Sequence, residues 1–344
     1  MRFIKRDIDI NFIGKKKITF ILSALMILAG IGSLVAHKGP KYGVDFAGGT
    51  LIQVQFPSPV NIQAVKDGLA EMDLAQSSVQ TFGDAKGNEY LIRTKQALTR
   101  EAGIADQIKD SLGAMTGSVP EIRRVDMVGP QVGEDLRKKA LLALFYALLF
   151  IAIYISGRFE MKWLVSGALA AALMSAVYFL SLFDVGMPFL IGSAIIVTLV
   201  FFWFLKLKYA MGAAVALLHD VLITVGIFSI FDKEFTLPIV AALLTIIGYS
   251  LNDTIIVFDR IRENQRKLSK KPLSVVINRS INETLSRTVL TSLTTLAVLA
   301  ALFVLGGGII HDFAFAMIIG VIVGTYSSMY VASPLLLAWE KVDG

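Results

Sequence analysis

The stretch IGYSLNDTIIVFDRIRENQRK, residues 247–267, places an ionisable group inside an otherwise lipid-soluble segment. Apolar residues run from Phe235 to Phe258, and the carboxylate of Asp253 stands among them. At about 1.5 Å per residue, a helix would hold Asp253 roughly 7 to 8 Å inside its charged end. An unpaired carboxylate is costly to bury there, so the group must be protonated, paired or facing water.

The composition of the whole chain of 344 residues is that of a membrane protein. Apolar residues make up 55% and charged residues 17%, and the mean hydropathy is +0.67, beyond the range of soluble domains of this length. Several stretches are long enough to cross a hydrocarbon layer of about 30 Å as helices. They are 18–36, 140–157, 163–183, 185–205, 209–231, 235–258, 288–310 and 313–339. We therefore predict a polytopic α-helical membrane protein with about eight transmembrane helices.

The distribution of Lys and Arg predicts the orientation of these spans. Basic residues collect before the first span, at 158–162, at 206–208 and within 260–279. All four regions fall on one side, which the positive-inside rule makes cytoplasmic, together with both termini. The net charge of +6 then reflects topology and anionic lipid, and we expect no nucleic-acid partner. The basic segment 259–272 is predicted to be an amphipathic helix lying on the lipid surface.

A long segment between the first two spans predicts an extracytoplasmic α+β domain. Strands are expected at 49–56, 89–95 and 121–129, and helices at 61–73 and 99–115. The order of strand, helix, strand, strand, helix, strand suggests a ferredoxin-like fold. We divide the chain into a cytoplasmic N-terminus with the first span (1–37), this domain (38–138) and a seven-helix bundle (139–344). No catalytic constellation or metal site is apparent, so we expect a binding or mechanical role and no enzyme activity.

The segment SINETLSRTVLTSLTTL, residues 280–296, offers a partner for Asp253. Arg287 stands at a comparable depth, and threonines at helical spacing make one side of this helix polar. A nearby cation lowers the pKa of a carboxyl group and desolvation raises it, so Asp253 could gain and lose a proton as it parts from and meets Arg287. The alternatives are a permanent buried salt bridge, or an Arg287 that only reaches toward the interface.

A second ionisable pair lies in ALLHDVLITVG, residues 216–226. His219 and Asp220 would sit near the middle of a span, where such groups are costliest. Neighbouring residues on a helix diverge by about 100°, so the two should not both face one partner. They could form a proton relay or a hydrogen-bonded lock between helices, or Asp220 could simply be satisfied by nearby hydroxyls.

A glycine-rich stretch, GVDFAGGT at residues 43–50, follows the first span. It lacks the Lys and Ser/Thr of a phosphate-binding loop. We interpret it as a tight turn that couples the span to the α+β domain, formed by Gly43, Asp45, Gly48 and Gly49.

Four segments together resemble the SecF family of bacterial protein-translocase subunits, within the resistance-nodulation-division (RND) superfamily. They are YGVDFAGGTLIQVQF, ALLHDVLIT, IGYSLNDTIIVFDRIREN and INETLSRTVLTSLTTL. The resemblance covers residues 1 to about 162 and 206–344, and it implies an RND-like bundle. It also implies that Asp253 and Arg287 conduct protons, and we add Asp220 as a third candidate. The supporting polar residues would be Asn252, Thr254, Thr288, Thr291 and His219.

The resemblance further implies that the chain works with SecD to drive protein export through SecYEG by the proton-motive force. Expected partners are then SecD, SecYEG, YajC, the translocating preprotein and membrane lipid. The expected place is the bacterial inner membrane, with the α+β domain on the periplasmic side. Protons would be the coupling ion, with no cofactor and no metal. An RND-type small-molecule antiporter and a passive assembly scaffold remain as alternatives.

The sequence departs from the family pattern in one region. Members of the family ordinarily have six spans, whereas residues 163–205 add two more. The residues around Lys162 and Trp163 weakly echo Lys208 and Tyr209, as a partial duplication would. An even number of added spans preserves the topology downstream. The extra pair could sit at the periphery or fill part of the partner interface.

Overall fold

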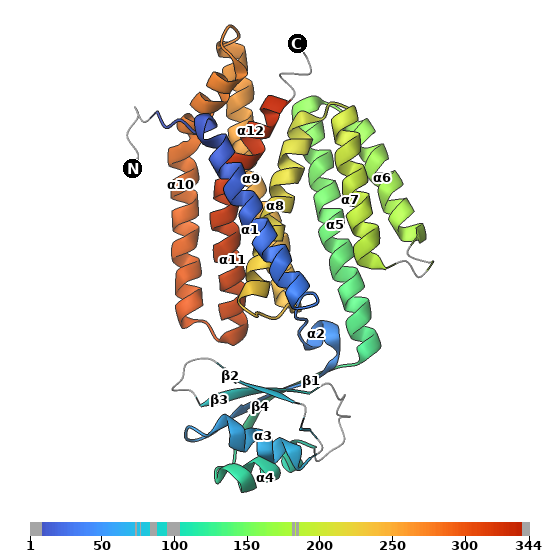
Figure 1. Cartoon of the computed structure of the whole chain (residues 1–344), viewed down its shortest axis with the longest axis vertical. Helices are drawn as coiled ribbons and strands as arrows, with labels where there is room; N and C mark the ends of the chain where they lie inside the picture. The colour runs from blue at the N-terminus through green and yellow to red at the C-terminus, as the bar shows by residue number, and fades with distance from the viewer. Residues whose placement is uncertain are drawn as a thin grey trace.

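The structure, a computed structural model, describes residues 9–72, 74–75, 77–82, 88–94, 104–180, 183 and 186–338. It consists of a helical bundle with a smaller α+β domain at one end (Figure 1). We call this end of the bundle the domain end and the other the free end. The described chain begins and finishes at the free end.

The described residues contain eight helices long and apolar enough to cross a membrane. They are α1 (Lys16–Ala36), α5 (Pro130–Glu160), α6 (Trp163–Leu180), α7 (Met187–Phe204), α8 (Lys208–Ile230), α9 (Leu237–Lys267), α10 (Leu273–Leu305) and α11 (Gly308–Ser327), the last continued by shorter helical turns to Ala338. This agrees with the predicted polytopic helical membrane protein. The end of the last predicted span, at residue 339, lies outside the described residues.

Three helices are longer than the spans predicted for them. Helix α5 begins at Pro130, so the boundary predicted at 138/139 falls inside it. Helices α9 and α10 continue beyond the predicted spans at the free end, and only residues 268–272 separate them. The basic segment 259–272 was predicted to lie on the lipid surface, and this is wrong. Its helix pairs with the start of α10 instead, where Asn264 Nδ2 donates to Ser280 Oγ at 3.0 Å.

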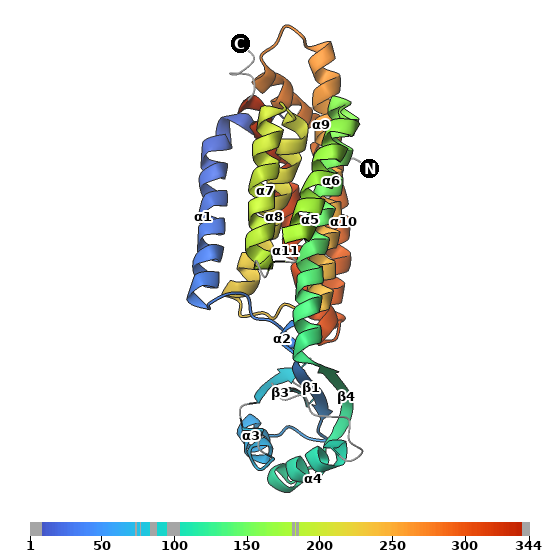
Figure 2. The same cartoon turned by 90° about the vertical axis from the view of Figure 1, so that its right-hand side faces the viewer.

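The α+β domain contains one four-stranded antiparallel sheet in the order β2-β3-β1-β4. Its strands are β1 (Gly49–Gln55), β2 (Ser78–Phe82), β3 (Glu89–Thr94) and β4 (Glu121–Val128). Helices α3 (Ile62–Ala70) and α4 (Ile104–Thr116) cover the face of the sheet away from the bundle (Figure 2). The first residues of the helix predicted at 99–115 lie outside the described residues. The other face of the sheet points toward the bundle.

The alternation of apolar side chains along β1 determines which face of the sheet packs into the core of the α+β domain. Ile52 and Val54 are fully buried and Phe56 nearly so, as the period of two predicts. They pack against apolar residues of both helices, and burying each such side chain contributes about 1.5–3 kcal/mol. Asn61 starts α3 by accepting a hydrogen bond from Gln63 N at 2.9 Å, the usual role of an N-cap side chain.

Helices α6 and α7 form a hairpin at the edge of the bundle, beside α5 (Figure 1). Although this hairpin separates α5 from α8 in the sequence, the end of α5 contacts the start of α8. Glu160 Oε1 accepts a hydrogen bond from Tyr209 N at 2.9 Å, and the rings of Phe159 and Tyr209 stack at 5.1 Å. Lys162 Nζ donates to the Leu205 carbonyl at 2.8 Å, which closes the base of the hairpin. The extra pair therefore lies at the periphery of this chain's bundle.

Helix α9 lies between α8, α10 and α11 in the bundle. The approach of α11 to α9 depends on small residues. A Cβ added to Gly324 would lie 2.8 Å from the Cβ of Ser250, closer than real Cβ atoms come. The GxxxG pair at Gly320 and Gly324 therefore serves packing within this chain.

Candidate functional site

Asp253 lies deep in the bundle, on the buried face of α9. Its side chain is 2% exposed, and its Oδ2 has no hydrogen-bond partner among the described residues. Thr288, on the neighbouring helix α10, is 1% exposed and its hydroxyl is likewise unpartnered within the described chain. Buried polar atoms are nearly always satisfied, so these two unpartnered atoms on adjacent helices make this region a candidate site.

Arg287 does not form an ion pair with Asp253 in the described structure. Its side chain is exposed on the outer surface of α10, although it is close enough to act on the charge of Asp253. A permanent buried salt bridge, one of the alternatives above, is therefore absent from this conformation. Of the supporting residues, Thr254 is buried beside Asp253, whereas Asn252 is exposed and Thr291 is half-buried.

Asp220 and His219 form a second polar centre on α8, and both are buried. Asp220 Oδ2 accepts hydrogen bonds from Ser250 Oγ of α9 at 2.5 Å and from Ser327 Oγ of α11 at 2.8 Å. His219 Nδ1 lies 2.9 Å from Asp220 Oδ1, and His219 Nε2 lies 2.9 Å from Ser23 Oγ of α1. The two side chains touch each other but reach different helices, in agreement with their predicted divergence.

The glycine-rich turn at 43–50 bonds to the start of α9. Gly43 N donates to the Phe235 carbonyl at 2.8 Å, and Phe235 N donates to the Lys41 carbonyl at 2.7 Å. Asp45 Oδ2 accepts a hydrogen bond from Leu237 N, the first residue of α9, at 2.8 Å. The residue before the helix, Thr236, makes no capping hydrogen bond of its own. Asp45 therefore caps the helix that carries Asp253.

The two glycines that follow let the chain pass from the bundle to the sheet. Short helix α2 (Val44–Ala47) ends at Gly48, whose φ of 74° is unfavourable for other residues. A Cβ on Gly48 would lie 2.9 Å from Pro130 Cα at the start of α5. Gly49, with φ of 115°, begins β1. The turn thus contacts α5 and α9 and leads directly into the sheet.

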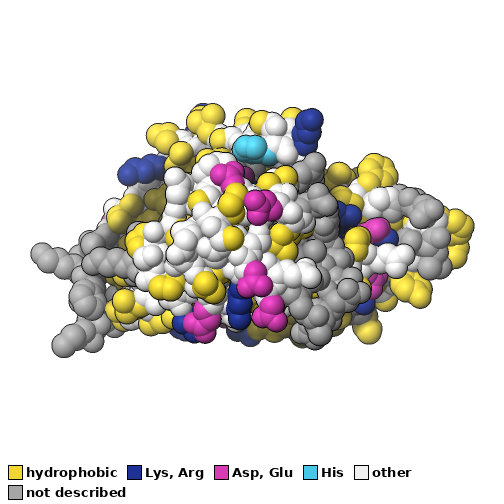
Figure 3. All heavy atoms as spheres, turned by 90° about the horizontal axis from the view of Figure 1, so that it is seen from below, with side chains coloured by type: hydrophobic (Ala, Val, Ile, Leu, Met, Phe, Trp, Pro, Cys, Tyr) yellow, Lys and Arg dark blue, Asp and Glu magenta, His cyan; other side chains and the backbone are white. Residues whose placement is uncertain are grey.

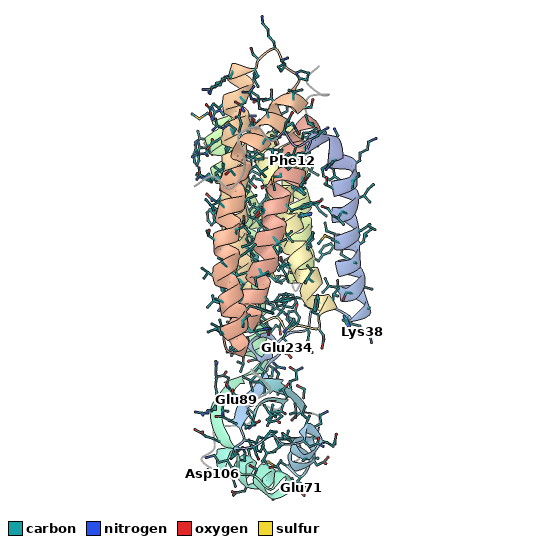
Figure 4. The ribbon with its side chains drawn as sticks, turned by 90° about the vertical axis from the view of Figure 1, so that its left-hand side faces the viewer. Phe12, Lys38, Glu71, Glu89, Asp106 and Glu234 are labelled. Atoms are coloured by element: carbon teal, nitrogen blue, oxygen red, sulfur yellow. The ribbon has the colours of Figure 1, made fainter. Side chains whose placement is uncertain are left out.

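A buried ion pair joins the sheet to the same junction. Arg93 Nη1 of β3 lies 2.6 Å from Glu234 Oε1 in the loop before α9, with both side chains largely buried. Figure 4 shows Glu234 between the bundle and the α+β domain. Burial raises the pKa of Glu234 above its ordinary value of 4.5. The charges around it are those of Arg93 and Lys41, which oppose this rise, and of Asp232 and Asp312, which add to it.

Sequence reasoning missed Glu234, Arg93 and the serines around Asp220. Glu234 sits in a short acidic loop and Arg93 in an alternating strand, so neither residue stands out from its surroundings.

Among the described residues there is no cluster of His, Cys, Asp or Glu that could hold a metal ion. Figure 3 shows acidic side chains, together with some Lys and Arg, on the face seen from below the α+β domain.

Comparisons with known proteins place this arrangement in a family. The sequence matches the family described as protein export membrane protein SecD/SecF, C-terminal, at residues 107–189 and 181–342. It matches the SecD/SecF GG motif at residues 33–60, which include the turn capping α9. The two matches to the first family overlap at the connection between α6 and α7.

Individual relatives agree with this result. The protein translocase subunit SecF of Magnetococcus marinus is 43% identical over 99% of this chain and 95% of its own. That of Vibrio alginolyticus is 39% identical over 98% of this chain and 91% of its own. The crystal structure of SecDF from Thermus thermophilus, a translocon-associated membrane protein, matches with a TM-score of 0.71 at 32% identity. That match covers 98% of this chain but 40% of the SecDF chain. The chain belongs to the SecF family of protein translocase subunits.

Proposed function

We propose that this chain is a non-enzymatic, proton-coupled subunit that promotes protein export together with SecD. The buried, unpartnered carboxyl of Asp253 carries the proposal. A carboxyl group in this position changes charge when it gains or loses a proton, and its charge is opposed by Arg287 when that residue approaches. Protonation would weaken this attraction and let α9 and α10 change their relative position.

The junction at the domain end would transmit such a movement to the α+β domain. Asp45 holds the first turn of α9, and Arg93 holds the loop before it through Glu234. A shift of α9 therefore pulls on the start of β1 and on β3. The antiparallel order β2-β3-β1-β4 supports a ferredoxin-like fold for this domain, which we place on the periplasmic side, with both termini in the cytoplasm.

An exposed polar surface at membrane depth supports SecD as the direct partner. Asn252 of α9 and Arg287 and Thr294 of α10 are exposed on the bundle. Thr294 donates its hydroxyl to the carbonyls of Leu290 and Thr291 within its own helix. Lipid cannot satisfy the polar atoms of Asn252 and Arg287, so this surface fits a polar helix of another subunit. The SecDF chain contains additional polypeptide besides the part that matches this chain, as expected if SecD supplies that helix. SecYEG, YajC and the preprotein would be reached through this complex, and lipid would cover the remaining apolar faces.

The test is preprotein release from inner-membrane vesicles that contain the chain and SecD in equal amounts, with and without an imposed proton gradient. Asp253→Asn keeps the shape of the side chain but cannot ionise. Asp259→Asn is the matched control, because Asp259 lies on the same helix in a half-exposed pair with Arg158. We expect the gradient to accelerate release in wild type and Asp259→Asn only. An equal response in Asp253→Asn would show that the chain acts as a scaffold for its partner.

A further inference from the structure

A continuous set of hydrogen bonds runs from Asp220 toward the free end of the bundle. From His219, the set continues to Ser23 Oγ at 2.9 Å. Ser23 Oγ lies 3.1 Å from the hydroxyl of Tyr326, and that hydroxyl donates to the Thr19 carbonyl at 2.7 Å. Three helices, α8, α1 and α11, contribute to this set.

The set crosses a substantial part of the bundle's depth. Asp220 lies about 18 Å along α8 from its start at Lys208, at about 1.5 Å per residue. Thr19 lies only about 5 Å along α1 from its start at Lys16. Both starts are at the free end (Figure 1). The side chains change from fully buried at Asp220 to half-buried at Tyr326.

We propose that Asp220, His219, Ser23 and Tyr326 form a proton relay between the centre of the bundle and the cytoplasm; this rests on the proton-coupled function proposed above. Asp220 gives its proton to His219 Nδ1, and His219 Nε2 gives its own to Ser23 Oγ. Ser23 passes its hydroxyl proton to the oxygen of Tyr326. Tyr326 releases its proton to water at the free end, after its O–H has turned from the Thr19 carbonyl. Each member ends with the number of protons it began with, except Asp220, which is left ionised.

The relay connects to the proposed coupling residue through α9. Ser250, which donates to Asp220, precedes Asp253 by one helical turn, and both lie on the buried face of α9. Within the described chain, no Lys or Arg lies within ion-pair distance of Asp220, whose acid-base partner is His219. The ionised carboxylate left by transfer would be held by the hydroxyls of Ser250 and Ser327.

A simple lock between helices accounts for less of this arrangement. Ser250 and Ser327 alone would satisfy Asp220 and tie α8 to α9 and α11. The further steps through an imidazole and two hydroxyls, each able both to donate and to accept, are what a relay requires. Directly after Ser327, the helix widens into a π-helical turn at Ser328–Ala332, a feature frequent at functional sites.

The experiment measures proton flux in inverted membrane vesicles that contain the full chain with SecD, using a pH-sensitive dye. Tyr326→Phe and Ser23→Ala each remove one hydroxyl of the relay. The matched controls are Tyr330→Phe, whose ring packs on Tyr326 at 5.2 Å, and Ser33→Ala, whose hydroxyl joins α1 to Ser229 of α8 at 2.8 Å. Protein abundance and thermal midpoint are measured for every variant, so that flux is compared only between folded proteins.

We expect Tyr326→Phe and Ser23→Ala to lower the flux by about tenfold or more, with both controls within about twofold of wild type. If Asp253→Asn abolishes flux while Tyr326→Phe and Ser23→Ala conduct as wild type does, the relay is overturned and the proposed function stands. If the wild-type complex conducts no protons, the proposed function fails as well. A folded Tyr326→Phe variant with lower stability and undiminished flux would show that the chain of bonds is a helix lock.

Discussion

Removing the carboxylate of Asp45 should loosen the start of α9. Its hydrogen bond to Leu237 N satisfies one of the amides that the first turn of a helix leaves unpaired. Replacing an N-cap side chain by Ala costs about 1 kcal/mol, within a range of about 0.5–2. Because about 1.4 kcal/mol corresponds to a factor of ten, Asp45→Ala should speed local opening at Leu237 about fivefold, within about two- to thirtyfold.

Amide hydrogen exchange measured by mass spectrometry on a peptide spanning the start of α9 reports this opening directly. Asp45→Asn keeps an acceptor at the same place and loses only the charge near the helix N-terminus, which contributes about 0.3–1 kcal/mol. Its exchange should therefore lie between wild type and Asp45→Ala. Asp232→Ala is the control in the neighbouring loop, since its exposed pair with Lys41 should contribute little.

Two results would refute this reasoning. Exchange at Leu237 that is unchanged in Asp45→Ala would show that the backbone bonds at Gly43 and Phe235 hold the junction without the cap. An Asp45→Asn variant as loose as Asp45→Ala would show that charge, not the hydrogen bond, is what matters.

Two further predictions concern the ion pair at the junction and the contact of α11 with α9. We call the α+β domain docked when Arg93 contacts Glu234. Burial in the docked form raises the pKa of Glu234 above 4.5, so the docked form binds more protons than the undocked form. Docking should be strongest near or below pH 4.5 and should weaken as the pH rises through the raised pKa. Glu234→Gln should remove this dependence, as measured by exchange protection of β3 against pH, and a variant with the wild-type slope would contradict the assignment. Gly324→Ala should lower the thermal midpoint, because its Cβ meets Ser250 and overpacking costs about 1–3 kcal/mol. Gly248→Ala, where a Cβ meets nothing within 4 Å, should not, and equal midpoints would argue against tight packing at Gly324.

Local patterns in the sequence predicted the helices, most of the α+β elements and the two buried acids. Asp253 and Asp220 stand out because a charge in an apolar run is rare. The lengths of α9 and α10 were underestimated, since charged helix that leaves the membrane has the composition of a connector. Hydropathy cannot distinguish such a helix from a connector. The hydrogen bond between Asn264 and Ser280 shows that the two extended helices contact each other here.

The pairings within the site depend on tertiary structure. Ser23 meets His219 across 196 residues, and Asp45 meets Leu237 across 192. Nothing in either segment specifies its partner, because a serine in a span or an aspartate in a turn has many possible roles. The sequence predicted that the glycine-rich turn couples two parts of the chain, and the structure shows which helix Asp45 caps.

The hydrogen bond between Glu160 and Tyr209 has a consequence for how this bundle can vary. Since α5 and α8 meet as though directly joined, the α6–α7 hairpin departs and returns at a single point. A hairpin inserted in this way can be acquired or discarded without re-threading any other helix or inverting the chain beyond it. Variation of this kind would change the outer edge of the bundle, while the helices that carry Asp220 and Asp253 keep their contacts with each other.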